Sequence, residues 1–106
     1  MSDRRVIGAN YHKYINTGVR IIGQIVEKEN NRFTIQTTDD KRIIVIMNEK
    51  SQIDRIETQW VEVVGQVQDD LSIMEKMTYA VNTEVPLDCQ VWNDSILLME
   101  KFNQLF

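Results

Sequence analysis

The chain has 106 residues, of which 42% are hydrophobic and 26% charged, and its formal net charge is -4 at pH 7. This length supports one domain with a single modest core, and the composition excludes an intrinsically disordered chain. The acidic balance counts against unaided binding to a polyanion, because contacts to phosphates supply most of the nonspecific affinity for nucleic acids.

The first part of the chain predicts a polar tail over residues 1–7, a turn of helix capped by Asn10, and a long strand over residues 19–28. The strand carries β-branched residues on both sides of Gly23. A glycine inside a strand usually marks a bend, a bulge or the close approach of another backbone. We therefore expect this strand to bend at Gly23.

Two further strands are predicted after a polar turn. Apolar and polar residues alternate over residues 32–38, so Phe33 and Ile35 are expected in the core, while the polar side chains face outward: Arg32, Thr34, Gln36 and Thr38. The run over residues 42–47 is almost continuously apolar. Such a run predicts a strand that is buried on both faces.

A connector and a fourth strand are expected next. Residues 48–59 are polar apart from Ile53 and Ile56, which would anchor a turn of helix or a loop. The strand over residues 60–68 repeats the pattern of the first strand, with Gly65 in the place of its internal glycine. Two long strands that bend at matching places indicate a small, strongly coiled sheet that closes into a barrel.

Asp69 and Asp70 form the turn to a fifth strand over residues 71–81. Pro86 then ends the sheet pattern. The apolar residues of the fifth strand lie mostly at odd positions and are expected to face the core: Leu71, Ile73, Met77, Tyr79 and Val81.

The C-terminal segment predicts an amphipathic helix that begins after an Asp88 cap and runs to about Phe106. One edge is expected to cover the barrel and the other to meet partners, and the pattern leaves open which edge does which. Leu97 lies outside the apolar arc, among polar residues. The arc spans about half the circumference, wider than the roughly 100° that one core needs; its members are Leu105, Leu98, Val91, Phe102, Ser95, Phe106, Met99, Trp92 and Ile96.

Five short strands with a connector between the third and fourth, followed by a helix, are the element order of an OB-fold. The sequence therefore predicts a mostly β protein, a five-stranded OB-fold barrel with a C-terminal amphipathic α-helix. We expect the tail over residues 1–7, the barrel over residues 8–81, and a linker with an oligomerisation helix over residues 82–106.

The order and spacing of these segments resemble the small-subunit family of replication protein A (RPA), the third OB-fold subunit of the eukaryotic heterotrimer that binds single-stranded DNA. The similarity runs from about residue 5 to the end of the chain. The segments that resemble the first strand, the fourth strand and the C-terminal helix of that family are Val19–Ile25 (VRIIGQI), Val61–Val67 (VEVVGQV), Leu87 with Asp88, Val91–Asp94 (VWND), Phe102 and Gln104–Phe106 (QLF).

The resemblance implies a nuclear structural subunit that assembles through its C-terminal helix with a middle and a large subunit. It would meet single-stranded DNA mainly through those partners, in replication, repair, recombination or telomere maintenance. A general RPA and a telomere-specific RPA-like complex stay open as alternatives. The residues expected to bind the partners are Val91, Trp92, Ser95, Leu97, Leu98, Met99, Phe102, Leu105 and Phe106.

An independent single-stranded nucleic-acid-binding OB domain is the alternative. Such a domain stacks bases on aromatic residues of its second and third strands and holds the backbone with basic residues. Here the outward residues of the second strand are polar, and Asp69 and Asp70 would repel phosphates. Arg32 and Arg42 are weak candidates for nucleic-acid contacts. Charge and stacking groups both favour the scaffold.

The sequence predicts no enzyme, no cofactor and no metal site. His12 has no Asp, Ser or Cys at a spacing that suggests a catalytic set. The single cysteine, Cys89, makes neither an internal disulfide nor a recognisable zinc site. No apolar run approaches the length of a membrane span, and the N-terminal residues lack the core of a signal peptide. We therefore expect a cytosolic or nuclear protein without a membrane partner.

Overall fold

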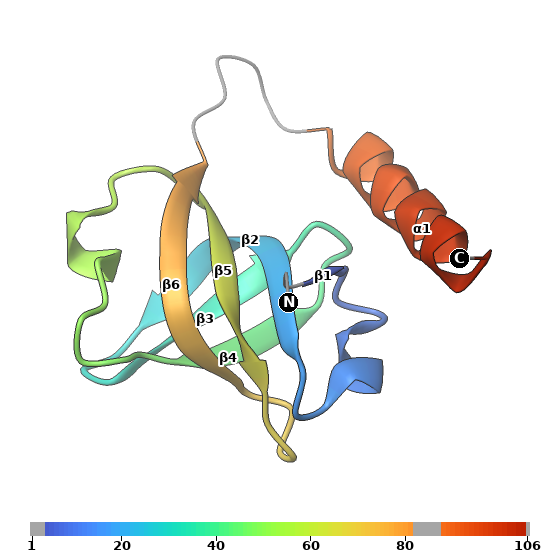
Figure 1. Cartoon of the computed structure of the whole chain (residues 1–106). Coiled ribbons are helices and arrows are strands. Elements are labelled where there is room, and N and C mark those ends of the chain that lie inside the picture. Colours follow the sequence, from blue (N-terminus) through green and yellow to red (C-terminus); the bar gives the residue numbers. More distant parts are fainter. Residues whose placement is uncertain (1–3, 82–87, 106) are drawn as a thin grey trace.

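The computed structural model describes residues 4–81 and 88–105, with side chains up to residue 101, so most of the expected linker and Phe106 lie outside the described residues. Figure 1 shows the strands wrapped around a common centre, with the C-terminal helix beside them. The elements in chain order are β1 (Arg4–Arg5), η1 (Tyr11–Tyr14), β2 (Gly18–Lys28), β3 (Arg32–Thr37), β4 (Arg42–Ile46), η2 (Ile53–Arg55), β5 (Trp60–Val67), β6 (Ile73–Val81) and α1 (Cys89–Leu105).

Six strands form one sheet that closes into a ring. Their order is β1-β2-β3-β4-β6-β5, and β2 pairs with β5 to complete the circuit. The pairings of β1 with β2 and of β4 with β6 are parallel, and the other pairings are antiparallel. The five longer strands are those that the sequence predicts, and the two-residue β1 is an addition to them.

The length of β2 lets it serve two neighbours in turn. Gly23 lies at the change, because it pairs with both Thr37 of β3 and Val61 of β5. A Cβ on Gly23 would lie 2.8 Å from the carbonyl oxygen of Gln36. Figure 1 shows β2 curving at this side of the barrel. This close approach of a neighbouring backbone is one of the roles expected of a glycine inside a strand, and the bend at Gly23 itself stays a prediction.

A bulge beside Gly65 sets the register of β5 and β6. Val64 pairs with Met77, but Gly65 pairs with Glu75, so Lys76 is the extra residue on β6. Because side chains alternate along a strand, one extra residue exchanges the inward and outward positions on the two sides of the bulge.

The bulge overturns the predicted inward face of β6. Ile73, before the bulge, is buried as expected, and Val81 is half-buried. Glu75 and Thr78 are buried instead of the apolar residues between and after them. The prediction that Leu71, Met77 and Tyr79 face the core is wrong, because all three are exposed. The bulge accounts for Met77 and Tyr79, whereas Leu71 lies in the turn before β6.

The core is apolar and draws on every long strand. Phe33 and Ile35 are buried in β3 as the alternation predicts, and Ile53 of η2 anchors the connector. In β4, however, Ile44 is exposed between two buried neighbours, so the prediction that this strand is buried on both faces is wrong. The outer face of a closed sheet meets solvent unless another element covers it. The buried core side chains are Val6, Val19, Ile21, Phe33, Ile35, Ile43, Val45, Ile53, Val61, Val63, Val67 and Ile73.

The N-terminal segment belongs to the barrel rather than to a tail over residues 1–7. Arg4 and Arg5 pair with β2, and Val6 and Ile7 are buried. The expected turn of helix is present as η1, but Asn10 makes no side-chain hydrogen bond that caps it. Within the described residues, the barrel therefore includes residues 4–7, ahead of the boundary expected at residue 8.

Candidate functional site

The C-terminal helix is the most conspicuous feature outside the barrel. The Val91 N–H donates a hydrogen bond of 3.1 Å to Asp88 Oδ1, which confirms the predicted cap. α1 has 17 residues, and in proteins most of the stability of a helix comes from the packing of its apolar face rather than from helix propensity. Its stability therefore depends on packing, and two of its faces meet different surroundings.

One side of α1 packs on the barrel. Ile96 is only 1% exposed, which a helix cannot achieve with its own side chains. One turn earlier, the Trp92 ring centroid lies 5.6 Å from the guanidinium carbon of Arg5 in β1. Arg5 Nε in turn lies 3.2 Å from Glu62 Oε2 in β5. The Trp92 edge of the predicted apolar arc is therefore the edge that faces the barrel.

Two polar contacts flank this apolar packing. Asn93 Nδ2 donates to the Thr38 carbonyl oxygen at 3.1 Å, and the Thr38 hydroxyl donates to Asn93 Oδ1. Near the other end of the helix, Asn10 Nδ2 donates to Glu100 Oε2 at 3.2 Å. Thr38 is buried by this contact, so the prediction that it faces solvent is wrong. We call the helix residues on this side the barrel face: Trp92, Asn93, Ile96 and Glu100.

The side of α1 that does not pack on the barrel exposes apolar side chains. Val91 is 60% exposed, Leu98 57% and Met99 50%, and the small Ser95 lies exposed among them. Figure 1 shows this helix beside the barrel with its outer side away from the strands. Large apolar side chains that gather on an exposed face mark interaction sites. We call these four residues the apolar stripe.

The other predicted partner-binding residues are distributed differently. Trp92 contacts Arg5 on the barrel rather than lying in the apolar stripe. Leu97 is 43% exposed, but a step of 100° per residue places it on the far flank of the helix, beside exposed Gln90 and Lys101. The side chains of Phe102 and Leu105, and all of Phe106, lie outside the described residues.

The weak nucleic-acid candidates are not brought together. Arg32 pairs with Ile46 at one end of the β3–β4 hairpin, and Arg42 pairs with Gln36 at the other end. Arg32 Nε is also 2.7 Å from Glu29 Oε2, so its charge is already matched. The only aromatic residue of these two strands, Phe33, is buried in the core.

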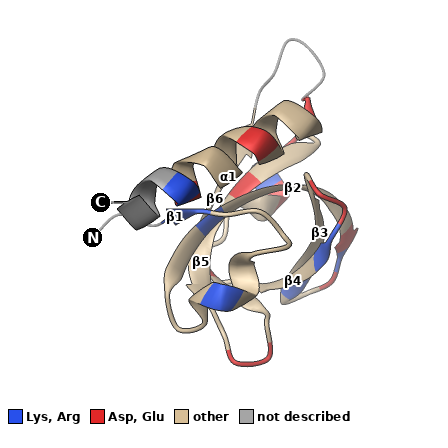
Figure 2. Ribbon diagram, turned by 90° about the vertical axis from the view of Figure 1, so that its right-hand side faces the viewer, with Lys and Arg blue, Asp and Glu red and all other residues tan. Residues whose placement is uncertain are grey.

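The charges around the barrel are mixed. Figure 2 shows acidic residues at the turn between β5 and β6, the lowest loop in that view. Asp70 there accepts hydrogen bonds from the backbone and hydroxyl of Ser72, which lower the pKa of its carboxyl group and keep it ionised. A fixed negative charge at this turn disfavours a phosphate backbone.

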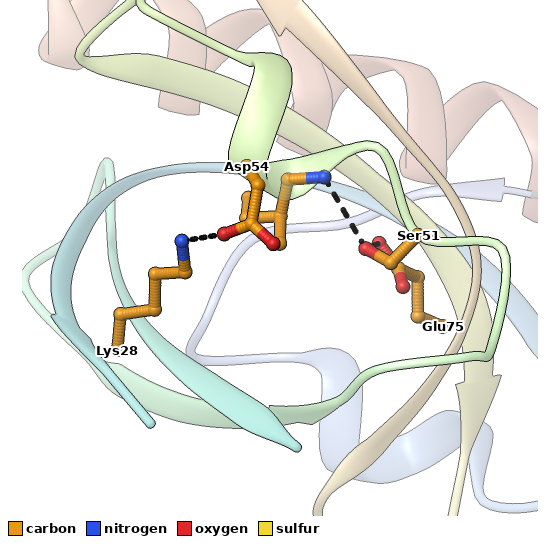
Figure 3. A network of polar contacts seen from close by, with 5 residues as sticks. Lys28, Ser51, Asp54 and Glu75 are labelled. Carbon is orange, nitrogen blue, oxygen red and sulfur yellow. Dashed lines mark hydrogen bonds and ion pairs between the residues drawn. The ribbon is translucent and has the colours of Figure 1, made fainter. Parts of the chain in front are cut away.

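A second polar cluster holds the connector between β4 and β5. The buried Glu75 carboxylate accepts hydrogen bonds from the Asn48 N–H at 3.1 Å, from Ser51 Oγ at 3.0 Å and from the Thr78 hydroxyl. Figure 3 shows Ser51 and Glu75 together on one side of the connector, with the Lys28–Asp54 ion pair on the other. The donors are neutral groups that satisfy the carboxylate, which is the arrangement of a structural anchor.

Neither a metal site nor a membrane span emerges from the described part of the chain. Over residues 4–81 and 88–105, no group of three or more His, Cys, Asp or Glu side chains is placed to hold a metal ion. Across the same residues, no helix is long and apolar enough to cross a membrane. Burial, together with Asp40 and Asp88, raises the pKa of the Cys89 thiol, which is the opposite of an activated nucleophile.

The docking residues on the barrel were missed by sequence reasoning. Arg5, Asn10 and Thr38 are separated from their helix partners by 55 positions or more, as for the contact between Thr38 and Asn93. Hydrophobic periodicity reports only the faces of one element, so it carries no signal for such pairs. Two polar residues in distant elements can be recognised as partners only when the fold places them in contact.

Comparison with known proteins supports this architecture. The model of a family described as Replication factor A protein 3 matches residues 1–106. A structure of U. maydis replication protein A bound to single-stranded DNA has a TM-score of 0.84 at 23% identity, covering 100% of this chain and 98% of the other. The S. pombe Stn1–Ten1 complex has a TM-score of 0.66 at 11% identity, covering 95% and 94% of the two chains.

The S. pombe telomere capping protein Ten1 alone has a TM-score of 0.67 at 10% identity, and the match covers 94% of this chain and 99% of that one. No curated protein sequence matches the chain significantly. Because these identities are low, the structural likeness speaks for the fold alone. It confirms the predicted mostly β OB-fold with a C-terminal helix.

Proposed function

The chain belongs to the Replication factor A protein 3 family, the RPA small-subunit family, and from this premise we propose that it is the structural small subunit of an RPA-type heterotrimer. In this role it assembles with a middle and a large subunit through α1. The role is non-enzymatic and nuclear. It contributes to the single-stranded DNA-binding complex by holding the subunits together.

The observation that carries this proposal is the division of α1 into two faces. Ile96 on the barrel face is 1% exposed, whereas Val91 and Leu98 of the apolar stripe are more than half exposed. The barrel therefore covers the barrel face of the helix and leaves Val91 and Leu98 uncovered. A partner helix that covered Val91 and Leu98 would recover free energy from each side chain, about 1 kcal/mol for the exposed half of each.

The small Ser95 between the larger side chains suits a helix as the occupant of the stripe. Val91, Ser95 and Leu98 recur at intervals of four and three residues, the spacing by which one helix presents a row to another. Phe102 and Leu105, which the sequence places on the same arc, remain proposed members of this surface. Leu97, on the far flank, is proposed as a secondary contact.

The barrel is proposed to contact DNA mainly through the assembled partners. Its β3–β4 hairpin lacks outward aromatic residues, and Arg32 is matched by Glu29. The family match supports a role in DNA replication. A telomere-specific version of the same assembly stays the alternative. Both versions use the same stripe, so the identity of the copurifying subunits distinguishes them.

One observation favours a second candidate, an independent nucleic-acid-binding domain. Arg42 is exposed at the end of β4, with the exposed Ile44 two residues away on the same outer face. The U. maydis structure is described as bound to single-stranded DNA. Direct titration of the isolated chain separates this candidate from the scaffold, because only the independent domain binds without partners.

Co-expression tests the scaffold proposal. The tagged chain is expressed with candidate middle and large subunits from the same organism, and the complex is purified on the tag. We expect both subunits to copurify with the natural chain and to be lost when Val91 and Leu98 are both changed to Glu. Retention of both subunits by that variant, with the barrel folded, would remove α1 from the interface.

A further inference from the structure

We propose that Arg5 is a positioning residue that fixes α1 on the barrel, so that the apolar stripe is presented outward before any partner binds. This inference rests on the proposed function of the stripe. It concerns a different part of the molecule, because Arg5 lies in β1 and contacts Trp92 of the barrel face.

The first step is how Arg5 itself is held. Its backbone pairs with Arg20 of β2, and both guanidinium groups converge on Glu62. Arg20 donates from its NH2 nitrogen to Glu62 Oε1 at 3.0 Å, while Arg5 Nε makes an ion pair with Oε2 rather than a well-directed hydrogen bond. Glu62 is 7% exposed. A carboxylate buried to this degree needs its cations, so it constrains where they lie.

The second step is what the constrained guanidinium touches. Its other neighbour is the Trp92 ring, with 5.6 Å between the guanidinium carbon and the ring centroid, a cation–π contact. Arg5 therefore links a buried carboxylate of β5 to the first turns of α1. Figure 2 shows the basic strand β1 running alongside the helix.

The third step is that the remaining docking contacts come from segments tied to one another. The Asp39 carboxylate accepts hydrogen bonds from the Gly8 N–H at 2.9 Å and the Ala9 N–H at 2.8 Å, which fastens the N-terminal segment to the β3–β4 turn. Thr38 of that turn and Asn10 of that segment contact Asn93 and Glu100 of the helix. The docking surface is thus one connected unit.

The consequence concerns assembly. Because docking uses the barrel face, a partner can bind the apolar stripe without displacing the helix. A helix that is already ordered and oriented loses less conformational entropy on binding than one that must fold at that moment. Loss of the Arg5 contact therefore weakens assembly by reducing the fraction of molecules in which the helix is docked.

Hydrogen–deuterium exchange of the full chain tests the docking. For Arg5→Ala we expect exchange over residues 89–101 to rise about two- to fivefold, the factor that a cation–π contact supports, while β5 stays protected. Arg4→Ala is the matched control, because it removes the same charge from the same strand, and the Arg4 guanidinium lies 5.7 Å from the Tyr14 ring instead of the helix. Unchanged exchange in Arg5→Ala, or an equal rise in Arg4→Ala, overturns the proposal.

A double-substitution cycle guards against general destabilisation by Arg5→Ala. Trp92→Leu removes the ring from the helix side and leaves the Arg5–Glu62 ion pair in place. If the two residues act through one contact, the double variant exchanges no faster than the faster single variant. If instead the rise in exchange of the double variant equals the product of the two single rises, the effects are independent and the assignment is overturned.

Assembly measured on the same variants separates this inference from the proposed function. We expect Arg5→Ala to bind the partner subunits more weakly, by the factor by which the docked fraction of the helix falls and by no more than about two- to fivefold, and Arg4→Ala to bind normally. A looser helix with unchanged affinity overturns the presentation role of Arg5. Normal assembly by the stripe variant contradicts the proposed function instead, and the exchange result then reports on docking alone.

Discussion

Gly65 lies so close to Met74 that a Cβ on Gly65 would sit 2.3 Å from the Met74 carbonyl oxygen. No change of side-chain rotamer relieves that contact, because the backbone of residue 65 fixes the position of the Cβ and the atom it meets is a backbone oxygen. We predict that Gly65→Ala costs on the order of a few kcal/mol in the free energy of unfolding, through overpacking at the bulge. Urea denaturation of the variant and the natural chain measures this loss.

Gly23→Ala is the matched comparison for Gly65→Ala. Its Cβ would approach a carbonyl oxygen less closely, at 2.8 Å from Gln36, so its cost should be smaller. A Gly65→Ala protein with the midpoint of the natural chain would show that the strands separate easily at the bulge and that this glycine has another role.

Glu75 should be more important to stability than an exposed carboxylate. Its two oxygens accept from Asn48, Ser51 and Thr78, so Glu75→Gln would turn an amide NH2 toward donors and leave buried groups unsatisfied. We predict a loss of about 1 to 3 kcal/mol, against about 1 kcal/mol for Ser51→Ala, which removes one hydrogen bond. Equal stability of Glu75→Gln and the natural chain in urea would contradict this role.

The free energy of unfolding should depend on pH in the alkaline range because of Tyr11. Its hydroxyl donates to the Leu71 carbonyl oxygen at 2.9 Å, and burial, together with Asp70, raises the pKa of the phenol. A raised pKa in the folded state means that the unfolded chain releases the proton first. The stabilisation is therefore complete below the ordinary pKa of tyrosine, about 10, and is lost as pH rises through the folded pKa.

Tyr11→Phe tests that dependence. At pH 7 it should lower the free energy of unfolding by about 0.5 to 1 kcal/mol, because a partly exposed hydrogen bond is lost. Above about pH 10 the difference between the two proteins should shrink, since the natural chain loses the same bond. Stability curves that stay parallel from pH 7 to the alkaline limit would show that Tyr11 does not titrate with folding.

The isolated chain should bind single-stranded DNA poorly. The net charge is -4, and the two candidate arginines lie at opposite ends of one hairpin. We predict a Kd weaker than about 100 μM for a labelled oligonucleotide even at low salt, the weak end of nonspecific binding. Micromolar binding that Arg32→Ala or Arg42→Ala abolishes would favour the independent binding domain.

The positions of the five longer strands and the helix along the chain could be predicted because they depend on local patterns. Alternation at Phe33 and Ile35, the glycines inside two long strands, and the Asp88 cap are all properties of short segments. The inward face of β6 could not be predicted, because the bulge beside Gly65 exists only in the pairing of two strands. An apolar run such as that around Ile44 likewise does not reveal whether anything covers its second face.

The two edges of the helix illustrate the same limit at the candidate site. Periodicity placed Trp92 and Leu98 on one apolar arc, but only the fold brings Arg5 to Trp92 and leaves Leu98 exposed. Composition indicated a single folded domain, and the family was indicated by the resemblance of whole segments; neither indicated which side chains meet. Contacts between residues far apart in sequence are set by the topology of the barrel.

The central claim is that the apolar stripe of α1 binds the partner subunits, and the affinity of the reconstituted heterotrimer tests it most directly. Leu98→Glu places a charge in the stripe, Leu97→Glu places one on the far flank, and Gln90→Glu adds the same charge to the polar side as the matched control.

Isothermal titration calorimetry of the folded variants against the two other subunits gives the Kd values. We predict a loss of about a hundredfold or more for Leu98→Glu, because an unpaired carboxylate would be buried in the interface. Leu97→Glu should lose less affinity, and the variant that carries both Leu97→Glu and Leu98→Glu should not assemble. Gln90→Glu should bind with the Kd of the natural chain. A Leu98→Glu protein that binds with the natural Kd would contradict the claim.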